Sequence, residues 1–159
     1  MTGPGHHATG FFSGVIAASI CYKLLGLPFL ISISSLPLAI WGSLFPDSIE
    51  SFMGFRWFRH RTVSHWVPLW LLGLVVAFYL PVSSPLGSAI QAGLVGFTVG
   101  GITHLIFDWP NPLGIPFLTP YRRHSLKLWN SGKREGLIVL VWAGIASLFW
   151  LPEIQAMLA

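Results

Sequence analysis

Apolar residues dominate the chain in long stretches that short polar segments separate. Residues 24–46, 62–107 and 136–152 contain no Asp, Glu, Lys or Arg. A helix that crosses a bilayer needs about 20 consecutive, mostly apolar residues, and the longest of these stretches has room for two of them. The pattern therefore predicts an all-α bundle embedded in a membrane.

Turn residues divide the apolar stretches into five expected transmembrane helices. These helices are predicted at residues 10–25, 29–45, 66–80, 86–107 and 136–151. Several are short for a hydrocarbon core of about 30 Å, so tilt or partial insertion is expected for some of them. The glycines of the fourth helix favour close packing against a neighbouring helix. The whole chain, residues 1–159, is predicted to form one domain.

The composition agrees with a membrane protein. Hydrophobic residues make up 53% of the chain and charged residues 9%, together with eight Trp and twelve Phe. Soluble domains contain about 25% charged residues. The single cysteine, Cys21, excludes a disulfide within the chain. The net charge of +4 is explained by basic cytoplasmic loops, so no nucleic-acid partner is expected.

The basic residues are distributed unequally between the two predicted sides of the membrane. With five spans, the N-terminus and the loops at 46–65 and 108–135 share one side, and the other side holds only Lys23. Positive charge marks the cytoplasmic side. The N-terminus is therefore predicted to be cytoplasmic, together with eight of the nine basic residues: Arg56, Arg59, Arg61, Arg122, Arg123, Lys127, Lys133 and Arg134.

Histidines and carboxylates are predicted to gather on this same side, close to the ends of different helices. Imidazole and carboxylate together suit Zn²⁺, Mn²⁺ or Fe²⁺, and the sequence offers no thiolate site. A structural alternative exists for several of them, because an Asp can cap a turn and a His can bond a backbone carbonyl. The candidate residues are His6, His7, Asp47, Glu50, His60, His65, His104 and Asp108.

Two pairs of these candidate residues have an informative spacing. His104 and Asp108 stand at i and i+4, so they share one helix face, and His104 lies about 6 Å deeper than Asp108. Ionisable groups at that depth normally face the bundle interior or a wet cavity. His60 and His65 are five residues apart, which suits a loop better than a helix for joint chelation. His124 lies within a basic loop and is expected to face lipid headgroups. The adjacent Arg122 and Arg123 can hold a phosphate.

Four motifs follow one another over about residues 5–120: Gly5-His6, Leu44-Phe45-Pro46-Asp47, His60-Arg61-x-x-Ser64-His65 and Gly101-x-x-His104-Leu105-x-x-Asp108-x-x-Asn111-Pro112-x-Gly114-x-Pro116. They resemble, in order, those of the YdjM-like family of bacterial inner-membrane proteins, described as metal-dependent hydrolases. That family is in turn similar to zinc-dependent phospholipase C and zinc-type single-strand nucleases, which are all-helical.

The resemblance implies a hydrolase of phosphoesters in the inner membrane. A lipid headgroup is the natural substrate for a site that opens at the cytoplasmic face, because such a site lies close to the headgroups. Divalent metal, zinc in the first place, is the expected cofactor, and membrane lipids are the expected partners. His60 or Glu50 would serve as base or orient a ligand, and Arg61 or Arg122 would stabilise developing negative charge. The expected metal ligands are His6, Asp47, His65, His104 and Asp108, with His7 as the alternative to His6.

The chain departs from the family pattern at three positions, of which Ser64 in place of the usual Thr is a mild change. Ile49 stands where relatives commonly carry a second Asp, with Glu50 as the nearest replacement, and Trp66 stands where they carry Ser. Two other functions therefore remain as alternatives, a non-catalytic membrane scaffold and a small metal-binding or ion-carrier protein. The absence of an ionisable residue at the middle of any predicted span speaks against the carrier.

Overall fold

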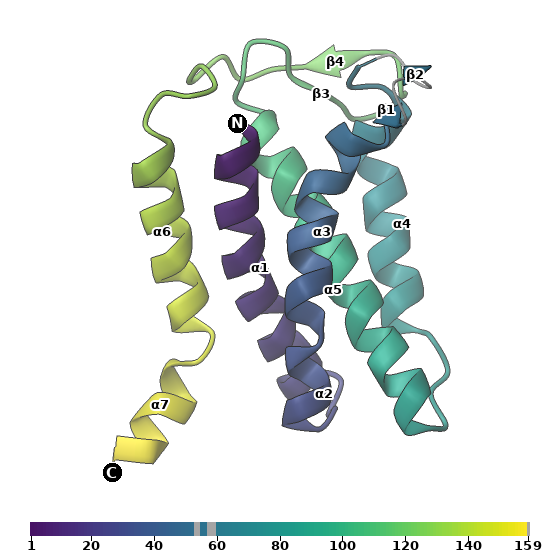
Figure 1. Cartoon of the computed structure of the whole chain (residues 1–159), viewed down its shortest axis with the longest axis vertical. Helices are drawn as coiled ribbons and strands as arrows, with labels where there is room; N and C mark the ends of the chain where they lie inside the picture. Colours follow the sequence, from purple (N-terminus) through teal and green to yellow (C-terminus); the bar gives the residue numbers. More distant parts are fainter. Residues whose placement is uncertain (53–54, 57–59, 159) are drawn as a thin grey trace.

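The computed structural model describes residues 1–52, 55–56 and 60–158, and this part of the chain is mostly helical, with 67% of residues in helices. Four very short strands and one 3₁₀ turn lie in the loops at one end (Figure 1). The elements are α1 (Gly3–Lys23), α2 (Phe29–Ile33), α3 (Ser35–Ser48), β1 (Ser51–Phe52), β2 (Phe55–Arg56), η1 (Val63–His65), α4 (Val67–Phe78), α5 (Pro85–Asp108), β3 (Ile115–Pro116), β4 (Arg123–His124), α6 (Glu135–Leu148) and α7 (Leu151–Leu158).

The long helices run side by side along one direction, as Figure 1 shows, with α6 on the outside next to α1. The N-terminus, the strand-bearing loops and the C-terminal end of α5 lie at one end of the bundle. The short helix α2, the connection between α4 and α5, and the C-terminus lie at the other end (Figure 1). We call the first of these the loop end. The predicted all-α class is confirmed by this arrangement.

Two helical segments of the described chain are long and apolar enough to cross a membrane, Phe29–Ser48 with 20 residues and Pro85–Asp108 with 24 residues. They correspond to the second and fourth predicted spans. The apolar helices α4 and α6, with 12 and 14 residues, are shorter than the roughly 20 residues that a perpendicular span needs. The structure therefore supports two candidate spans.

Two predicted boundaries were wrong. The first helix begins at Gly3 rather than at residue 10, because Pro4 fits the first turn of a helix, where no N–H is needed. The second predicted helix was expected to stop at Pro46, yet α3 continues through this proline to Ser48. Pro46 lies in the last turn, where the loss of one helical hydrogen bond is tolerated. Asp47 is consequently held on a helix rather than in a turn.

Glycines bring the backbones of α3 and α5 into direct contact, in agreement with the expectation for the fourth predicted helix. A Cβ atom on Gly96 would lie 2.1 Å from the Ser35 carbonyl oxygen, and one on Gly100 would lie 2.0 Å from that of Ala39. Helices approach this closely only where both present small residues. The contact places the end of α3, with Asp47, beside the end of α5.

Candidate metal centre

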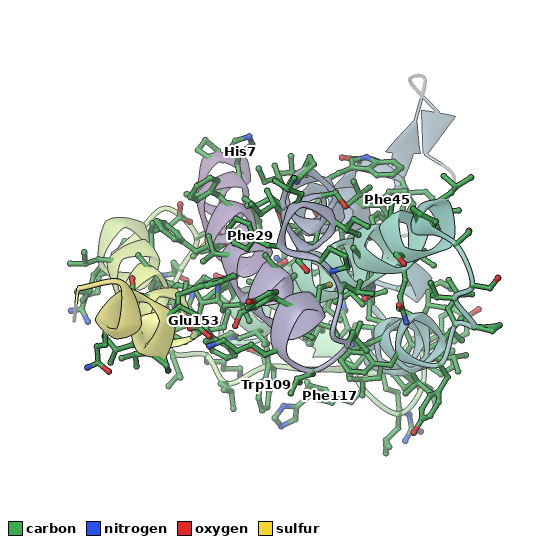
Figure 2. All side chains as sticks on the ribbon, turned by 90° about the horizontal axis from the view of Figure 1, so that it is seen from below. His7, Phe29, Phe45, Trp109, Phe117 and Glu153 are labelled. Carbon is green, nitrogen blue, oxygen red and sulfur yellow. The ribbon has the colours of Figure 1, made fainter. Side chains whose placement is uncertain are left out.

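The five predicted metal ligands meet at the loop end of the bundle. They come from four elements: α1, the last turn of α3, η1 and the last two turns of α5. The His6, His65, His104 and Asp108 side chains are at most 1% exposed, whereas 45% of the Asp47 side chain is exposed. His7 is exposed on the outer side of α1, where Figure 2 shows it at the rim of the molecule. Of the two adjacent histidines, His6 is thus the one that enters the cluster.

Four of these side chains present donor atoms at nearly equal distances. His65 Nε2 lies 3.0 Å from His104 Nε2. Asp47 Oδ1 lies 3.4 Å from the first of these nitrogens and 3.8 Å from the second. Asp108 Oδ2 lies 3.8 Å and 3.6 Å from the same two atoms. Ligands that lie about 2.0–2.1 Å from one ion in a tetrahedron are about 3.3 Å apart, so each of these distances suits a pair of ligands to a zinc-sized ion. The described donors form two trios that share His104, one with Asp47 and His65 and one with His6 and Asp108.

The hydrogen bonds of the two histidines define which nitrogen faces this centre. His104 Nδ1 lies 2.7 Å from the Ser43 carbonyl oxygen, which only accepts, so Nδ1 carries the proton. His65 Nδ1 lies 3.0 Å from Glu50 Oε1 and likewise donates to it. In neutral imidazoles both Nε2 atoms then present lone pairs to each other. Only a cation between them, a proton or a metal ion, makes that approach favourable, so the residues fit a metal.

Glu50 accounts for the orientation of His65. Its carboxylate is 6% exposed and also accepts from the Arg61 backbone N–H at 2.7 Å and from Ser64 Oγ at 2.5 Å. Carboxylates that fix the outer nitrogen of a metal-binding His are a recurrent feature of metal sites. With its oxygens engaged in this way, Glu50 suits the orienting role better than that of a free base.

The electrostatics of this pair follow from the same contacts. Burial would raise the pKa of Glu50, but hydrogen bonds from His65, Ser64 and His60 outweigh burial and lower this pKa to about 2. Burial would lower the pKa of His65, and hydrogen bonds with Asp47 and Glu50 outweigh it, so this pKa is raised. The surroundings of His65 therefore favour a positive charge at its ring.

His6 supplies a further donor next to the four. Its ring stacks on that of His104 with centroids 3.8 Å apart, and its Nε2 lies 3.3 Å from Asp108 Oδ1. Neither ring nitrogen of His6 has a hydrogen-bond partner within the described part of the chain. A buried polar group without a partner is costly, and a bound cation would remove that cost. Donor atoms of His6, His104 and Asp108 lie within 4.8 Å of one another.

Asp108 is also the acceptor of a buried ion pair. Its Oδ2 lies 2.5 Å from Arg61 Nη2, and its Oδ1 lies 2.5 Å from the Met1 amino nitrogen and accepts from Asn111 Nδ2 at 3.0 Å. Arg61 is 5% exposed, and its Nη1 donates to the Gly114 carbonyl oxygen at 3.2 Å. The guanidinium of Arg61 thus lies against Asp108 and the Gly114 carbonyl, and its expected role in stabilising charge on a substrate stays a prediction.

The centre opens on the side of Asp47 and His60. The His60 side chain is 47% exposed, and its Nδ1 lies 2.5 Å from Glu50 Oε2. Asp47, Glu50 and His60 present donor atoms within 4.8 Å of one another. Asp47 and His60 are thus the partly exposed members of the cluster, whereas the other donors of the described residues are buried.

Three contributors to the site were not among the predicted residues. Ser64 and Asn111 stand inside the family motifs, where their fixed spacing to His65 and Asp108 was an available signal. The Ser43 carbonyl that orients His104 had no such signal, because any residue offers a backbone carbonyl.

Arg122, Arg123 and His124 line a separate hollow beside the β3–β4 hairpin. Arg56 is described only as backbone of β2, and Arg59 lies outside the described residues.

Apolar helices of membrane-spanning length and a buried cluster of imidazoles and carboxylates at one end define a membrane protein with a candidate metal centre. The comparison with protein families gives the particular family: residues 1–159 match the YdjM inner membrane protein family, and the chain belongs to it. No match was found among curated proteins or among solved structures. The resemblance carried by the motifs is thereby confirmed over the whole chain.

Proposed function

We propose that this protein is a membrane-bound, metal-dependent hydrolase that acts on a phosphoester, in the first place a lipid headgroup, at the cytoplasmic face of the inner membrane. The observation that carries the proposal is the pair of Nε2 atoms of His65 and His104, 3.0 Å apart and flanked by two carboxylates. Imidazole and carboxylate donors suit zinc, and the partly exposed side chains of Asp47 and His60 lie on the side from which a substrate would approach.

The residues have distinct parts in this proposal. Asp47, His65, His104 and Asp108 would hold the ion, with His6 beside them. When bound, the metal supplies Lewis acidity, which polarises a phosphoryl oxygen and lowers the pKa of a bound water. His60 Nδ1 is engaged by Glu50, so its Nε2 is the ring atom left to accept or deliver a proton at the opening.

A lipid headgroup fits the location of the site. The donors lie at the ends of the two candidate spans, Asp47 one residue before the end of Phe29–Ser48 and Asp108 at the end of Pro85–Asp108. Helix ends of this length coincide with the level of the headgroups. A site at that level meets phosphodiester bonds of lipids without extracting the lipid from the bilayer.

The proposed topology has the loop end in the cytoplasm, with α1, α2–α3, α4, α5 and α6 crossing or entering the membrane. The N-terminus and both long loops lie at the loop end, and the C-terminus lies at the opposite end (Figure 1). A reporter that is active only in the periplasm is expected to be active at the C-terminus and silent when fused after Arg123, because basic loops stay in the cytoplasm. Reversed signals would contradict the topology and move the site to the other face.

Metal binding is tested most directly by Asp47→Asn. Asp47 is partly exposed and its Oδ1 faces the Nε2 atoms of His65 and His104, and Asn keeps an oxygen at that position, so the variant lowers the charge of one ligand at the accessible side of the cluster. We expect zinc affinity to fall about 10–100-fold, the range seen when a metal-supporting group is lost. Zinc titration of the detergent-purified protein gives the affinity, and hydrolysis of a model phosphodiester with and without chelator gives the activity.

Glu153→Gln is the matched control, because it also removes one carboxylate but at the opposite end of the protein, where Glu153 pairs with Lys23 at 2.8 Å. The control is expected to bind zinc like the unchanged protein. Equal zinc affinity in Asp47→Asn and in the control would contradict the site. Zinc binding without turnover on any phosphoester would favour the scaffold or carrier alternative.

A further inference from the structure

The hollow beside the β3–β4 hairpin lies at the loop end, outside the set of metal donors. It has a volume of about 370 Å³ and is lined by Trp109, Phe117, Leu118, Arg122, Arg123 and His124. Trp109 directly follows the metal-site residue Asp108, so the hollow and the candidate metal centre share the end of α5. Trp109 and Phe117 lie next to each other at the edge of the bundle in Figure 2.

The hairpin that forms one side of this hollow is fastened to the metal centre. Strands β3 and β4 pair antiparallel, with Ile115 opposite His124. Gly114 precedes them with a φ of +61°, and a Cβ atom there would lie 2.2 Å from the His124 carbonyl oxygen. The Gly114 carbonyl also accepts a hydrogen bond from Arg61, the ion-pair partner of Asp108. The position of the hollow is thus tied to that of the donors.

An aromatic wall orients the histidine of the hollow. The ring centroids of Trp109 and Phe117 are 5.0 Å apart. The ring centroid of His124 lies 6.1 Å from that of Trp109 and 6.2 Å from that of Phe117. Trp109 Nε1 donates to His124 Nδ1 at 3.0 Å. Because Nδ1 of His124 accepts, the proton of the neutral ring is on Nε2, where it is available to a ligand.

The two arginines bring positive charge without a counter-charge. Both side chains are exposed, and neither forms an ion pair with an acid in the described ranges 1–52, 55–56 and 60–158. Adjacent guanidinium groups with free N–H forks match the oxygens of a phosphate. A ligand with a phosphate group would therefore supply what Arg122 and Arg123 lack.

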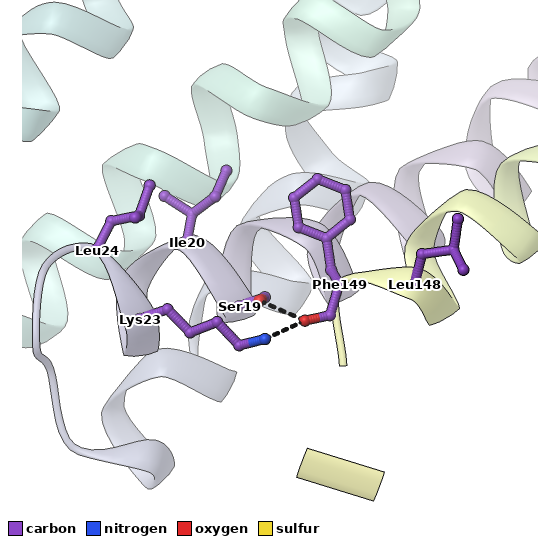
Figure 3. A pocket seen from close by; sticks show the side chains of 6 residues that line it. All are labelled: Ser19, Ile20, Lys23, Leu24, Leu148 and Phe149. Carbon is purple, nitrogen blue, oxygen red and sulfur yellow. Dashed lines mark hydrogen bonds between the residues drawn. The ribbon is translucent and has the colours of Figure 1, made fainter. Parts of the chain in front are cut away.

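The hollow at the opposite end of the protein provides a contrast. It also contains a cation, Lys23, but Figure 3 shows this side chain directed to the Phe149 carbonyl oxygen, and its Nζ lies 2.8 Å from Glu153 Oε2. The Ser19 hydroxyl donates to the same carbonyl at 3.1 Å. The polar groups there are occupied by the protein itself, unlike those of the hollow beside β4.

The rim of the hollow indicates the source of the phosphate. Leu118, which lines the hollow, is 90% exposed, and Tyr121, which directly precedes Arg122 in the chain, is 77% exposed. Apolar side chains next to arginines are typical of segments that lie in the membrane interface, where the apolar groups enter the lipid and the charges meet anionic headgroups. A soluble phosphate compound would make no use of these apolar side chains.

We propose that this hollow binds the phosphate of an anionic phospholipid. Arg122 and Arg123 contact the phosphate oxygens, the Nε2–H of His124 donates to the same group, and the rings of Trp109 and Phe117 lie against the glycerol portion. The lipid is thereby held beside the end of α5. That it is held for reaction rests on the proposed hydrolase function, whereas the binding itself does not.

Binding is measured on the full chain in detergent with EDTA present, so that the metal centre does not enter the result. The probes are dihexanoylphosphatidylglycerol, dihexanoylphosphatidylcholine and inorganic phosphate, and the readout is the dissociation constant. We expect phosphatidylglycerol to bind most tightly. The variant Arg122→Gln/Arg123→Gln is expected to bind it at least about tenfold more weakly, because two charge-assisted contacts are lost.

The matched control is Lys127→Gln/Lys133→Gln, which removes the same charge from the same connection between α5 and α6 but outside the hollow. Its affinity is expected to remain within about twofold of the unchanged protein, since these charges act only at long range. Equal losses in both variants would overturn the site in favour of general attraction. Inorganic phosphate binding as tightly as the lipid would overturn the lipid assignment. If the unchanged protein binds phosphatidylglycerol but does not hydrolyse it, the result contradicts the proposed hydrolase function alone.

Discussion

Asp108→Asn is expected to lower the free energy of unfolding by about 3–5 kcal/mol, the range seen when one partner of a buried ion pair is removed. Arg61 is 5% exposed, and its guanidinium lies 2.5 Å from Asp108 Oδ2. Without that carboxylate the guanidinium is a buried charge without its counter-charge. From the sequence, Asn would be expected to replace Asp with little disturbance of packing. Because of the ion pair with Arg61, a loss of stability is expected instead.

The stability is measured by chemical unfolding in detergent with EDTA, so that metal binding makes no contribution. The control is the double variant Arg61→Met/Asp108→Asn, which removes both charges. It is expected to recover part of the loss, because the guanidinium is then no longer buried without its counter-charge. An Asp108→Asn protein as stable as the unchanged one would show that Arg61 does not depend on Asp108.

Gly100→Ala is expected to destabilise the protein by about 1–3 kcal/mol or more, because the new methyl group has no space. Its carbon would lie 2.0 Å from the Ala39 carbonyl oxygen and 2.9 Å from the Ser43 backbone nitrogen, and backbone atoms cannot turn away as a side chain can. The helices α3 and α5 must separate. Zinc affinity is expected to fall as well, because the Ser43 carbonyl orients His104.

Gly93→Ala is the matched control on the same helix. A Cβ atom at Gly93 would lie 3.5 Å from Leu38 Cγ, an ordinary contact, and Ala favours a helix over Gly by about 0.5–1 kcal/mol. This variant should therefore be at least as stable as the unchanged protein in the same unfolding measurement. Equal stability of the Gly100→Ala protein would mean that the two helices do not approach each other through their backbones.

Local patterns were sufficient to predict the helices and part of the site. The i, i+4 spacing of His104 and Asp108 gave them a common face on any helix, and both are found buried on α5. The uncharged stretches predicted α3 and α5 because apolar length is a property of the sequence itself. The start of α1 was missed although Pro4 suits the first turn of a helix, and the continuation of α3 was missed because Pro46 was taken as the end of that helix.

The sequence by itself determined the class of protein, the positions of the apolar helices and the residue types at the loop end. Only the tertiary structure decided which groups meet. It paired Arg61 with Asp108, engaged Glu50 with Ser64 and the outer nitrogen of His65, and turned His6 inward. The physical reason is that these contacts join residues distant in sequence. Their distances depend on how closely the α3 and α5 backbones approach and on how the 60–66 segment folds over them, and neither is encoded in a local pattern.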